Sequence, residues 1–501
     1  MIALSLRLVN LRQPLLENFI DRQVQTAMMA RNLARDGSML YPEVDTGPFP
    51  AYYMLEFPGY PALAATVAAT TGLALDTAGR LVSAVAMALA CLLFFDLVRR
   101  HDGLAVGVVA GAVLALMPVT VRYGRAFQPD SMMFTLLIAA VWAMDRWAQP
   151  VLVRIGSEPH GQRWSFLLIA TLATTGAVLL KVISAYVLIP LAYLAWTRYR
   201  RASLRRWELW LALLLIVLPS LAWYVHAWKV ASGTTNVTTP CWHVHKWIAL
   251  GRLLDLPTYR QLAYYLGLRV LTPVGVVLAL IGALLRASRL GTEDRGSRTL
   301  LFHVWLASLA TYFPILVRKL DHEHYYLALA PVAAVFIARA LVSISAAPLA
   351  GRFYVTGPVA ASVLAVALLG SDLLACASTY RTPTEWQHVP AAAAAVRECT
   401  PPSARVVGHS SVLFYADRRG WNMVYRPQEV SFLFETWGRQ PTDPTPGTLL
   451  EFYRSQDTDY LVELLGTARE RSHAEFIDFV RDRYRVIREV PGKYSVAARR
   501  D

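Results

Sequence analysis

The chain has 501 residues, and this length alone would allow about three soluble domains. Its composition excludes that organisation, because hydrophobic residues make up 55% of the chain, charged residues only 17%, and the mean hydropathy is +0.38, as is typical of a protein folded in lipid. The formal charge of +14 does not indicate nucleic-acid binding, because much of the basic charge lies in short loops between apolar segments and forms no continuous face with stacking aromatics.

The N-terminal segment, residues 1–19, predicts a poor or truncated first helix. Two arginines interrupt its apolar run, which is shorter than the about 20 residues that a membrane crossing needs, and no signal-peptide cleavage site follows. A long polar loop comes next, at 18–57, in which Asp21 begins an amphipathic run. The apolar stretch 59–75 is flanked by prolines, and we expect it to form an interfacial helix.

Ten further apolar stretches are long enough to cross a bilayer. They lie at about 81–98, 104–121, 131–147, 165–180, 182–197, 208–226, 265–285, 299–317, 326–344 and 354–376. With the first helix they predict a polytopic bundle of about 11 spans. The loops that carry most of the arginine, such as 198–206 and 286–298, fall on one side, which should be cytoplasmic by the positive-inside rule.

The chain changes character at about residue 380, where strand and helix signals begin to alternate. The runs AAAAAVREC (391–399) and HAEFIDFVRDRYRVI (473–487) predict helices, while ARVVGHSSVLFYA (404–416) and TDYLVELL (458–465) resemble strands. We therefore expect a transmembrane catalytic domain at 1–379, with a first extracytoplasmic loop at 18–75, and a small extracytoplasmic α/β domain at 380–501.

Ionisable side chains gather in three loops that this topology places on the extracytoplasmic side. They are Asp21, Arg22 and Glu56 in the first loop, Arg125 and Asp130 in the loop 122–130, and His322, His324 and Tyr325 in the loop 318–325. We expect them to meet at the mouth of one helix bundle. Sugar transfer from a lipid phosphate needs a carboxylate base to activate the acceptor hydroxyl and cations to hold the leaving phosphate.

Lys181 is the most informative single candidate residue, because it stands at the break between the apolar stretches 165–180 and 182–197. A cation inside a membrane costs roughly 2.5–3.5 kcal/mol on insertion scales, which favours a functional role. Snorkelling of the side chain from a helix end to the interface explains the same position. Both interpretations remain open at this stage.

The two aspartates also have structural interpretations. Asp21 and Asp130 each stand at the start of a helical segment, where a carboxylate caps the helix or interacts with its dipole. His322 and His324 flank a carboxylate, but their spacing is not a zinc pattern and no third ligand is evident, so a polar pocket rim is the better interpretation. Only the common location of these residues on the extracytoplasmic side favours a functional role for them.

Five segments, in chain order, resemble bacterial members of the dolichyl-phosphate-mannose-protein mannosyltransferase family, close to the aminoarabinose transferases of lipid A and within the GT-C class. They are RQVQTAMMARNL (22–33), EFPGYP (56–61), RAFQPDSM (125–132), DHEHYYLALAP (321–331) and YADRRGW (415–421). Each segment is weakly specific alone, and the resemblance spans nearly the whole chain.

The resemblance implies a GT-C fold and a polyprenyl-phosphate sugar as donor. Carried over, Asp21 would be the base and Asp130 a second acid, with Arg22, Arg125 and Lys181 as phosphate partners and Glu56, His322, His324 and Tyr325 along the cavity. One departure stands out: relatives commonly read D-W-R-Q-x-D-T-A, whereas this chain reads I-D-R-Q-V-Q-T-A. An acid moved by one residue turns by about 100° on a helix.

The sequence thus predicts an integral-membrane glycosyltransferase of the bacterial inner membrane, with a protein, lipid or polysaccharide acceptor and no nucleic-acid partner. A divalent cation, Mg²⁺ or Mn²⁺, would suit paired carboxylates, but nothing in the sequence requires one. Two alternatives belong to other classes. A flippase for a lipid-linked glycan would show a repeat between its halves, which is not obvious here, and a non-catalytic scaffold would explain the altered first motif.

Overall fold

A computed structural model describes residues 1–35, 37–148, 160–232, 250–285, 300–317, 319–320, 322–347, 356–423, 446–465 and 483–500. The chain divides into two compact units. Unit 1 consists of Met1–Leu11, Arg80–Trp223 and Val244–Ala377, and unit 2 of Arg12–Gly79, Tyr224–His243 and Ser378–Asp501. The boundary expected at 379 stays a prediction, although the cut between Ala377 and Ser378 lies close to it.

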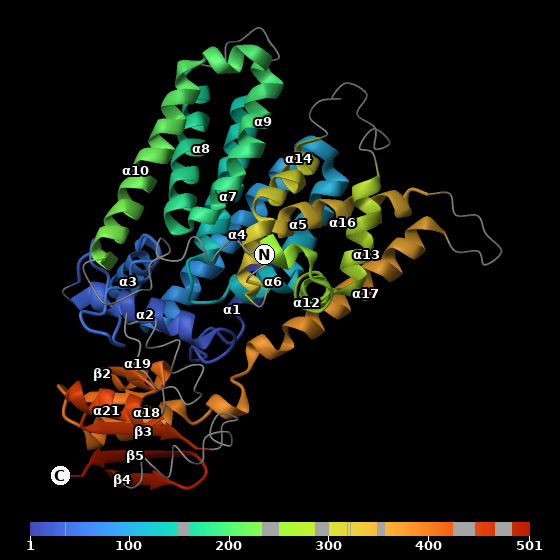
Figure 1. The fold of residues 1–501 in the computed structure, drawn as a ribbon. Helices are drawn as coiled ribbons and strands as arrows, with labels where there is room; N and C mark the ends of the chain where they lie inside the picture. Colours follow the sequence, from blue (N-terminus) through green and yellow to red (C-terminus); the bar gives the residue numbers. More distant parts are fainter. Residues whose placement is uncertain are drawn as a thin grey trace. The chain divides into compact units, whose positions relative to one another are not determined.

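In the described residues of unit 1 all regular elements are helices (Figure 1). Its α-helices, two of which extend into unit 2, are α1 (Ile2–Leu8), α4 (Leu75–Asp102), α5 (Leu104–Leu116), α6 (Pro118–Tyr123), α7 (Asp130–Ala148), α8 (His160–Leu180), α9 (Leu188–Tyr199), α10 (Trp207–Ser232), α12 (Leu256–Tyr264), α13 (Thr272–Leu284), α14 (Leu301–Ser308), α15 (Phe313–Leu316), α16 (Ala330–Ser345) and α17 (Gly357–Cys376). Shorter turns connect them: η1 (Val182–Val187), η2 (Arg200–Arg205), η4 (Leu250–Leu254), the π-helical η5 (Tyr265–Val270), η8 (Leu309–Thr311) and η9 (Glu323–Leu329).

Several of these helices suit a membrane. In the described part of the chain, four are long and apolar enough to cross one, namely Leu75–Asp102, Val182–Arg205, Trp207–Ser232 and Gly357–Trp386. The pair Leu256–Val270 and Thr272–Leu284 passes the same test together but bends by 104°, so it is a broken span or a re-entrant loop. The protein is therefore an integral membrane protein, while the expected total of about 11 spans stays a prediction.

The sequence periodicity located most apolar helices but missed breaks inside two of the expected spans. The expected span 299–317 is divided into α14, η8 and α15, and the span 265–285 is divided at η5 and α13. A proline near the start of α13 and another in α15 each lack the N–H that an uninterrupted helix would use, which explains why the helices restart there.

Close helix packing in unit 1 depends on a glycine of α13. A Cβ atom built on Gly282 would lie 1.7 Å from the backbone oxygen of Phe336 in α16, so only a residue without a side chain fits there. Because helix–helix contacts in membranes are driven by close backbone approach, this glycine lets α13 and α16 pack directly.

Replacing Gly282 by alanine should therefore lower the free energy of unfolding by about 1–3 kcal/mol or more, the usual cost of overpacking. Gly370 is the matched control, because it lies within α17 and a Cβ there meets nothing within 4 Å. The Gly370→Ala variant should be neutral or stabilised by about 0.5–1 kcal/mol. Thermal unfolding of the purified protein in detergent measures both, and equal midpoints for the two variants would contradict the packing argument.

Unit 2 combines helices with a mixed five-stranded sheet (Figure 1). Its elements are α2 (Ile20–Arg35), α3 (Gly59–Thr71), η10 (Ala377–Tyr380, whose first residue closes unit 1), η11 (Thr384–Trp386), α18 (Val389–Cys399), β1 (Arg405–Gly408), α19 (Ser410–Ala416), β2 (Arg419–Asn422), α21 (Pro446–Ser455), β3 (Tyr460–Leu464), β4 (Tyr484–Val490) and β5 (Tyr494–Arg499). The strand order is β2-β1-β3-β5-β4, with β1 parallel to both β2 and β3 and β5 antiparallel to both β3 and β4. The small α/β fold expected for the tail is present.

Two local predictions in the tail were wrong. The run 404–416 is not one strand, because β1 ends at Gly408 and the His409 side chain accepts a hydrogen bond from the Ser411 N–H, which caps the start of α19. The end of the expected helix 473–487 is strand β4, which pairs with β5, while 473–482 lie outside the described residues. Cross-strand pairing overrides the helical periodicity there.

The first polar loop packs on the tail within unit 2. Helix α2 contacts α19, and Arg31 of α2 forms ion pairs with Asp45 (Nη2–Oδ2, 2.6 Å) and Asp417 (Nη1–Oδ1, 3.2 Å). Partial burial raises the pKa of Asp417, but its hydrogen bond from Arg35 and the neighbouring guanidiniums outweigh this effect and leave the pKa below its usual value. These contacts tie the segment that holds Asp21 to the α/β domain.

Candidate active site

A buried ion pair joins Asp130 and Lys181 in unit 1. Helix α7 begins at Asp130 and α8 ends at Leu180, and because the two helices form an antiparallel hairpin, both residues come to the same end of it. The Lys181 Nζ lies 2.8 Å from Asp130 Oδ1, and both side chains are buried. Snorkelling to the surface is therefore not what the lysine does in this structure; instead it neutralises a carboxylate inside the unit.

Asp130 retains unused hydrogen-bonding capacity. Its Oδ2 atom is buried and accepts no hydrogen bond from any described residue, and neither oxygen caps the start of α7. A buried carboxylate oxygen without a donor is costly, and such an atom is well suited to accept a hydrogen bond from a bound hydroxyl.

Aromatic residues of the 322–326 segment lie beside Lys181 of this pair. The Tyr325 ring lies with its centroid 5.9 Å from Lys181 Nζ, and the His324 ring packs on it with 4.2 Å between centroids. The His322 ring lies 5.8 Å from that of His324, and Tyr123 of α6 contacts His324 edge-on at 6.0 Å. The structure thus brings together Asp130, Lys181 and three of the residues expected along the cavity, His322, His324 and Tyr325.

A second charged cluster, adjacent in the same segment, was not among the predicted site residues. Glu323 is buried and bridges two arginines, with its Oε2 2.8 Å from Arg122 Nε and its Oε1 2.5 Å from Arg269 Nε. One carboxylate against two guanidiniums leaves a net charge of +1. Arg122 is buried, whereas the Arg269 side chain is 31% exposed. The signal that marks Lys181, a lone cation in an apolar stretch, also marks Arg269 in 265–285 and could have found it.

Arg125 occupies the interior of unit 1. Its guanidinium is fully buried and donates from Nη2 to the backbone oxygen of Asn10 at 3.3 Å, while Arg80 donates to the Arg125 carbonyl at 3.1 Å. These contacts join the N-terminal segment to the connection between α6 and α7. Its expected contact with a lipid phosphate stays a prediction.

Asp21 stands in the first turn of α2 in unit 2 and is held by the start of α19. The Ser410 hydroxyl donates to Asp21 Oδ1 at 2.6 Å, and His409 Nε2 lies 3.5 Å from the same oxygen. The Asp21 side chain is 51% exposed, so the carboxylate is fixed through one oxygen and still reaches solvent. Sequence reasoning missed both partners, because the run that contains them resembles a strand.

The protonation of His409 follows from its neighbours. The Ser411 backbone N–H donates to His409 Nδ1 at 3.3 Å, so Nδ1 is an acceptor and the neutral ring carries its proton on Nε2, the atom that faces Asp21. The Trp386 ring packs on the imidazole with 4.6 Å between centroids. His409 is thereby oriented to donate to the aspartate and not to remove a proton from it.

Arg22 and Glu56 are also neighbours in unit 2, as the first loop folds back on α2. Arg22 forms an ion pair with Glu56 and donates a hydrogen bond to the Tyr53 hydroxyl. Burial raises the pKa of Tyr53, although the positive charge of Arg22 opposes this effect, so the phenol stays protonated at neutral pH. Both Arg22 and Glu56 are partly exposed.

The predicted site residues therefore form two groups, one in each unit. Asp130, Lys181, His322, His324 and Tyr325 belong to unit 1, and Asp21, Arg22 and Glu56 to unit 2. Their convergence on a single cavity stays a prediction. Across the described ranges no group of three or more His, Cys, Asp or Glu side chains could hold a metal ion, and the use of Mg²⁺ or Mn²⁺, which the sequence does not require, stays untested.

Residues 57–225 match the family model described as dolichyl-phosphate-mannose-protein mannosyltransferase. This range contains Arg125, Asp130 and Lys181, but neither Asp21 nor the 321–331 segment. No curated protein sequence matches the chain.

Solved structures of similar fold cover nearly the whole chain. ArnT from Cupriavidus metallidurans, bound to undecaprenyl phosphate, is 14% identical with a TM-score of 0.66, over 99% of this chain and 96% of that one. The archaeal oligosaccharyltransferase AglB from Archaeoglobus fulgidus, in complex with an inhibitory peptide and a dolichol-phosphate, is 12% identical with a TM-score of 0.58, over 92% and 68%. The arabinofuranosyltransferase AftD from Mycobacteria is 14% identical with a TM-score of 0.57, over 99% and 41%.

The resemblance that the five sequence segments suggested is confirmed. The chain has the fold of the GT-C glycosyltransferases and is similar in sequence, over 57–225, to the dolichyl-phosphate-mannose-protein mannosyltransferases.

Proposed function

We propose that the chain is an integral-membrane glycosyltransferase that moves a sugar from a polyprenyl-phosphate-linked donor to a hydroxyl of its acceptor on the extracytoplasmic face. The observation that carries this proposal is Asp21, a half-exposed carboxylate that the α/β domain fixes through Ser410 and His409. The fold supports it, because the ArnT and AglB structures of the same fold are bound to undecaprenyl phosphate and dolichol-phosphate.

In the proposed reaction Asp21 acts as the general base. The acceptor oxygen attacks the anomeric carbon of the sugar, its proton passes to Oδ2 of Asp21, and the bond between that carbon and the phosphate oxygen breaks. The phosphate leaves with the electron pair, so the configuration at the anomeric carbon inverts. The hydrogen bond from Ser410 to Oδ1, with His409 Nε2 at 3.5 Å from the same oxygen, holds the carboxylate in orientation during this step.

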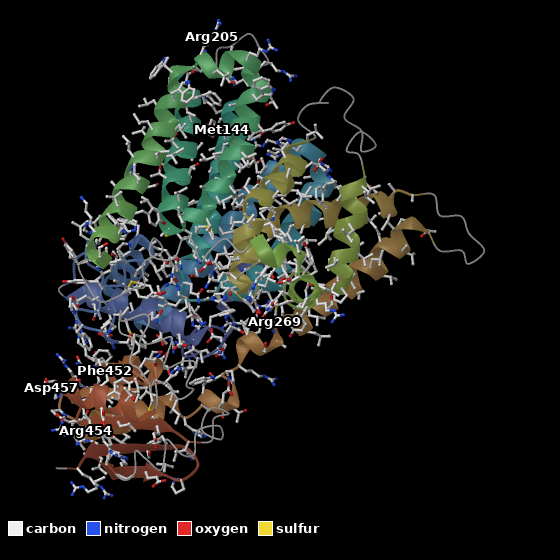
Figure 2. All side chains as sticks on the ribbon, in the orientation of Figure 1. Met144, Arg205, Arg269, Phe452, Arg454 and Asp457 are labelled. Atoms are coloured by element: carbon white, nitrogen blue, oxygen red, sulfur yellow. The ribbon has the colours of Figure 1, made fainter. Side chains whose placement is uncertain are left out.

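The leaving phosphate needs a cation, and the cluster of Glu323, Arg122 and Arg269 is the best candidate. Lys181 forms an ion pair with Asp130 and Arg22 with Glu56, whereas Glu323 faces two arginines, Arg122 and Arg269. Arg269 is the more exposed of the two, and its guanidinium keeps N–H groups beyond the Nε that Glu323 holds. Figure 2 shows Arg269 far from Arg205, which lies at the turn between α9 and α10 of the same unit.

Substitution of Arg269 by glutamine should lower kcat/KM for the lipid-linked donor by about 10–100-fold, the loss of a charge-assisted contact to phosphate. Arg205→Gln is the matched control, an exposed arginine of the same unit at the α9–α10 turn, and should leave kcat/KM unchanged. Steady-state transfer kinetics at varied donor concentration measure both. Equal values for the two variants would remove Arg269 from the donor site.

The activity itself is tested with purified protein in lipid vesicles. Undecaprenyl-phosphate sugars are supplied with envelope extract as acceptor, and mass spectrometry follows both transfer and release of undecaprenyl phosphate. The proposal expects release that depends on acceptor. Movement of the donor across the bilayer without any release would indicate the flippase instead. Envelope glycans and lipids of a deletion strain, compared by mass spectrometry, then identify the acceptor as the species that loses a sugar.

A further inference from the structure

A short exposed turn in the first loop carries consecutive exposed apolar side chains, which loops in water rarely do. Residues Ser38 to Tyr41, here named the 38–41 tip, form a tight turn in which Tyr41 N–H donates to the Ser38 oxygen at 3.1 Å and Leu40 N–H donates to Ser38 Oγ at 3.2 Å. The turn projects two consecutive apolar side chains, Met39 and Leu40, from its end. The polar composition of the surrounding loop gave no hint of this.

These side chains are solvent-exposed in the isolated chain. Met39 is 37% exposed, Leu40 54% and Tyr41 44%. Three consecutive large apolar or aromatic residues exposed together on a tight turn indicate a surface that is covered in the working protein.

The 38–41 tip lies against the end of a membrane-spanning helix within unit 2. His226 of α10 donates from Nε2 to the Leu40 backbone oxygen at 2.8 Å. The His226 ring also meets the Tyr41 ring edge-on, with 5.3 Å between centroids, and Tyr41 packs on Tyr52 at 5.6 Å. The tip is therefore at the same height along α10 as His226.

The length of α10 and its terminal tryptophans indicate the depth of His226, and therefore of the tip, in a bilayer. The helix has 26 residues and spans about 39 Å, more than the about 30 Å of a hydrocarbon core. Exposed tryptophans stand near both ends, Trp207 at one and Trp228 at the other, about 32 Å apart along the axis. Tryptophans at this separation mark the two headgroup regions. His226 is two residues from Trp228, so it lies at one of these interfaces.

We propose that the 38–41 tip inserts into the bilayer interface, with Met39 and Leu40 among the lipid acyl chains and Tyr41 at headgroup level. Lipid is the partner that we propose for the exposed side chains of the tip, because the tip lies level with exposed residues of α10 that face lipid. The insertion anchors the segment that follows α2, and it does not depend on the proposed activity.

The test uses the full chain with its four cysteines replaced and one new cysteine, Leu40→Cys, labelled with the fluorophore NBD. The protein is reconstituted into vesicles of phosphatidylethanolamine and phosphatidylglycerol. Lipids with a spin label on the acyl chain quench from the bilayer, and iodide quenches from water. Arg454→Cys is the control, an exposed position on α21 of the same unit that Figure 2 labels.

We expect quenching by the spin-labelled lipid to be about threefold stronger at position 40 than at position 454. Quenching by iodide should be weaker at position 40 than at position 454. Equal iodide quenching at both positions would overturn the proposal. Protection from iodide without lipid quenching would also overturn it, and would indicate a protein partner or a second copy of the chain. If the Leu40→Cys protein unfolds, Met39→Cys at the same tip gives the same measurement.

Discussion

Replacement of Asp21 by asparagine should lower the rate of sugar transfer by about 10²–10⁴-fold, the usual contribution of a general base. Asparagine has nearly the same shape, and its Oδ1 can still accept the hydrogen bond from Ser410 that Asp21 accepts at 2.6 Å. The contact between α2 and α19 should therefore survive, and the loss should fall on kcat and not on the thermal midpoint. Transfer from a radiolabelled undecaprenyl-phosphate sugar measures the effect.

Two controls separate this role from a structural one. Glu398→Gln neutralises an exposed carboxylate of the same unit that forms an ion pair with Arg488, and it should leave transfer unchanged. Ser410→Ala keeps the Asp21 carboxylate but removes its donor, so a modest fall in kcat is expected. An Asp21→Asn enzyme with undiminished transfer would exclude Asp21 as the base.

The altered motif gives a sharper version of this test. In the family pattern the acid stands one residue earlier, at the position of Ile20, which is the first residue of α2. Asp21→Asn combined with Ile20→Asp moves the carboxylate back by one position and turns it by about 100°. Because the Ser410 and His409 contacts are made at position 21, we expect the double variant to remain inactive. Restored transfer would show that the family position serves this chain too.

The sequence predicted the positions of the helices better than it predicted which side chains pair with one another. Hydropathy predicted spans that lie within α7 and α8. Lys181 lies at the break between α8 and η1, as expected from its position between two apolar stretches. That Asp130 would pair with it could be argued only once the hairpin was known, because the two residues are about fifty positions apart and periodicity carries no information on pairing. The partner of a buried charge is a property of tertiary structure.

The surroundings of Asp21 were beyond sequence reasoning for a related reason. His409 and Ser410 lie almost 390 residues away along the chain, in a run whose alternation of apolar residues is typical of a strand. The run is a strand followed by a helix that His409 caps, and the same hydrogen bond places the proton of the neutral ring on Nε2. Arg269, by contrast, could have been found, since an isolated arginine in an apolar stretch is the same signal as Lys181.

The buried pair of Asp130 and Lys181 should respond to substitution in a way that separates stability from catalysis. Asp130→Asn leaves a buried lysine without its counter-charge, and Lys181→Met leaves a buried carboxylate. Each should lower the free energy of unfolding by about 3–5 kcal/mol. The double variant removes both charges and should recover most of that stability, because an uncharged pair of similar volume has no desolvation cost to offset. Thermal unfolding in detergent completes this double-mutant cycle.

Unit 1 offers a matched control in a second buried ion pair. Arg339 of α16 donates to Asp102 of α4 from Nε at 3.1 Å and from Nη2 at 3.0 Å, and both side chains are fully buried. No substrate role is proposed for this pair. The single variants Asp102→Asn and Arg339→Met should be as destabilised as those at the first pair, and their double variant should recover stability and transfer together.

Transfer activity then decides what the first pair is for. If Asp130 accepts a hydroxyl of the donor or acceptor through its buried Oδ2, the Asp130→Asn, Lys181→Met double variant regains stability while transfer stays reduced by about 10²-fold or more. Recovery of transfer in step with stability, as at Asp102 and Arg339, would make the pair a structural element of the α7–α8 hairpin. In that case the Glu323 cluster, in which Arg122 and Arg269 outnumber the carboxylate, would remain the proposed site for the donor phosphate.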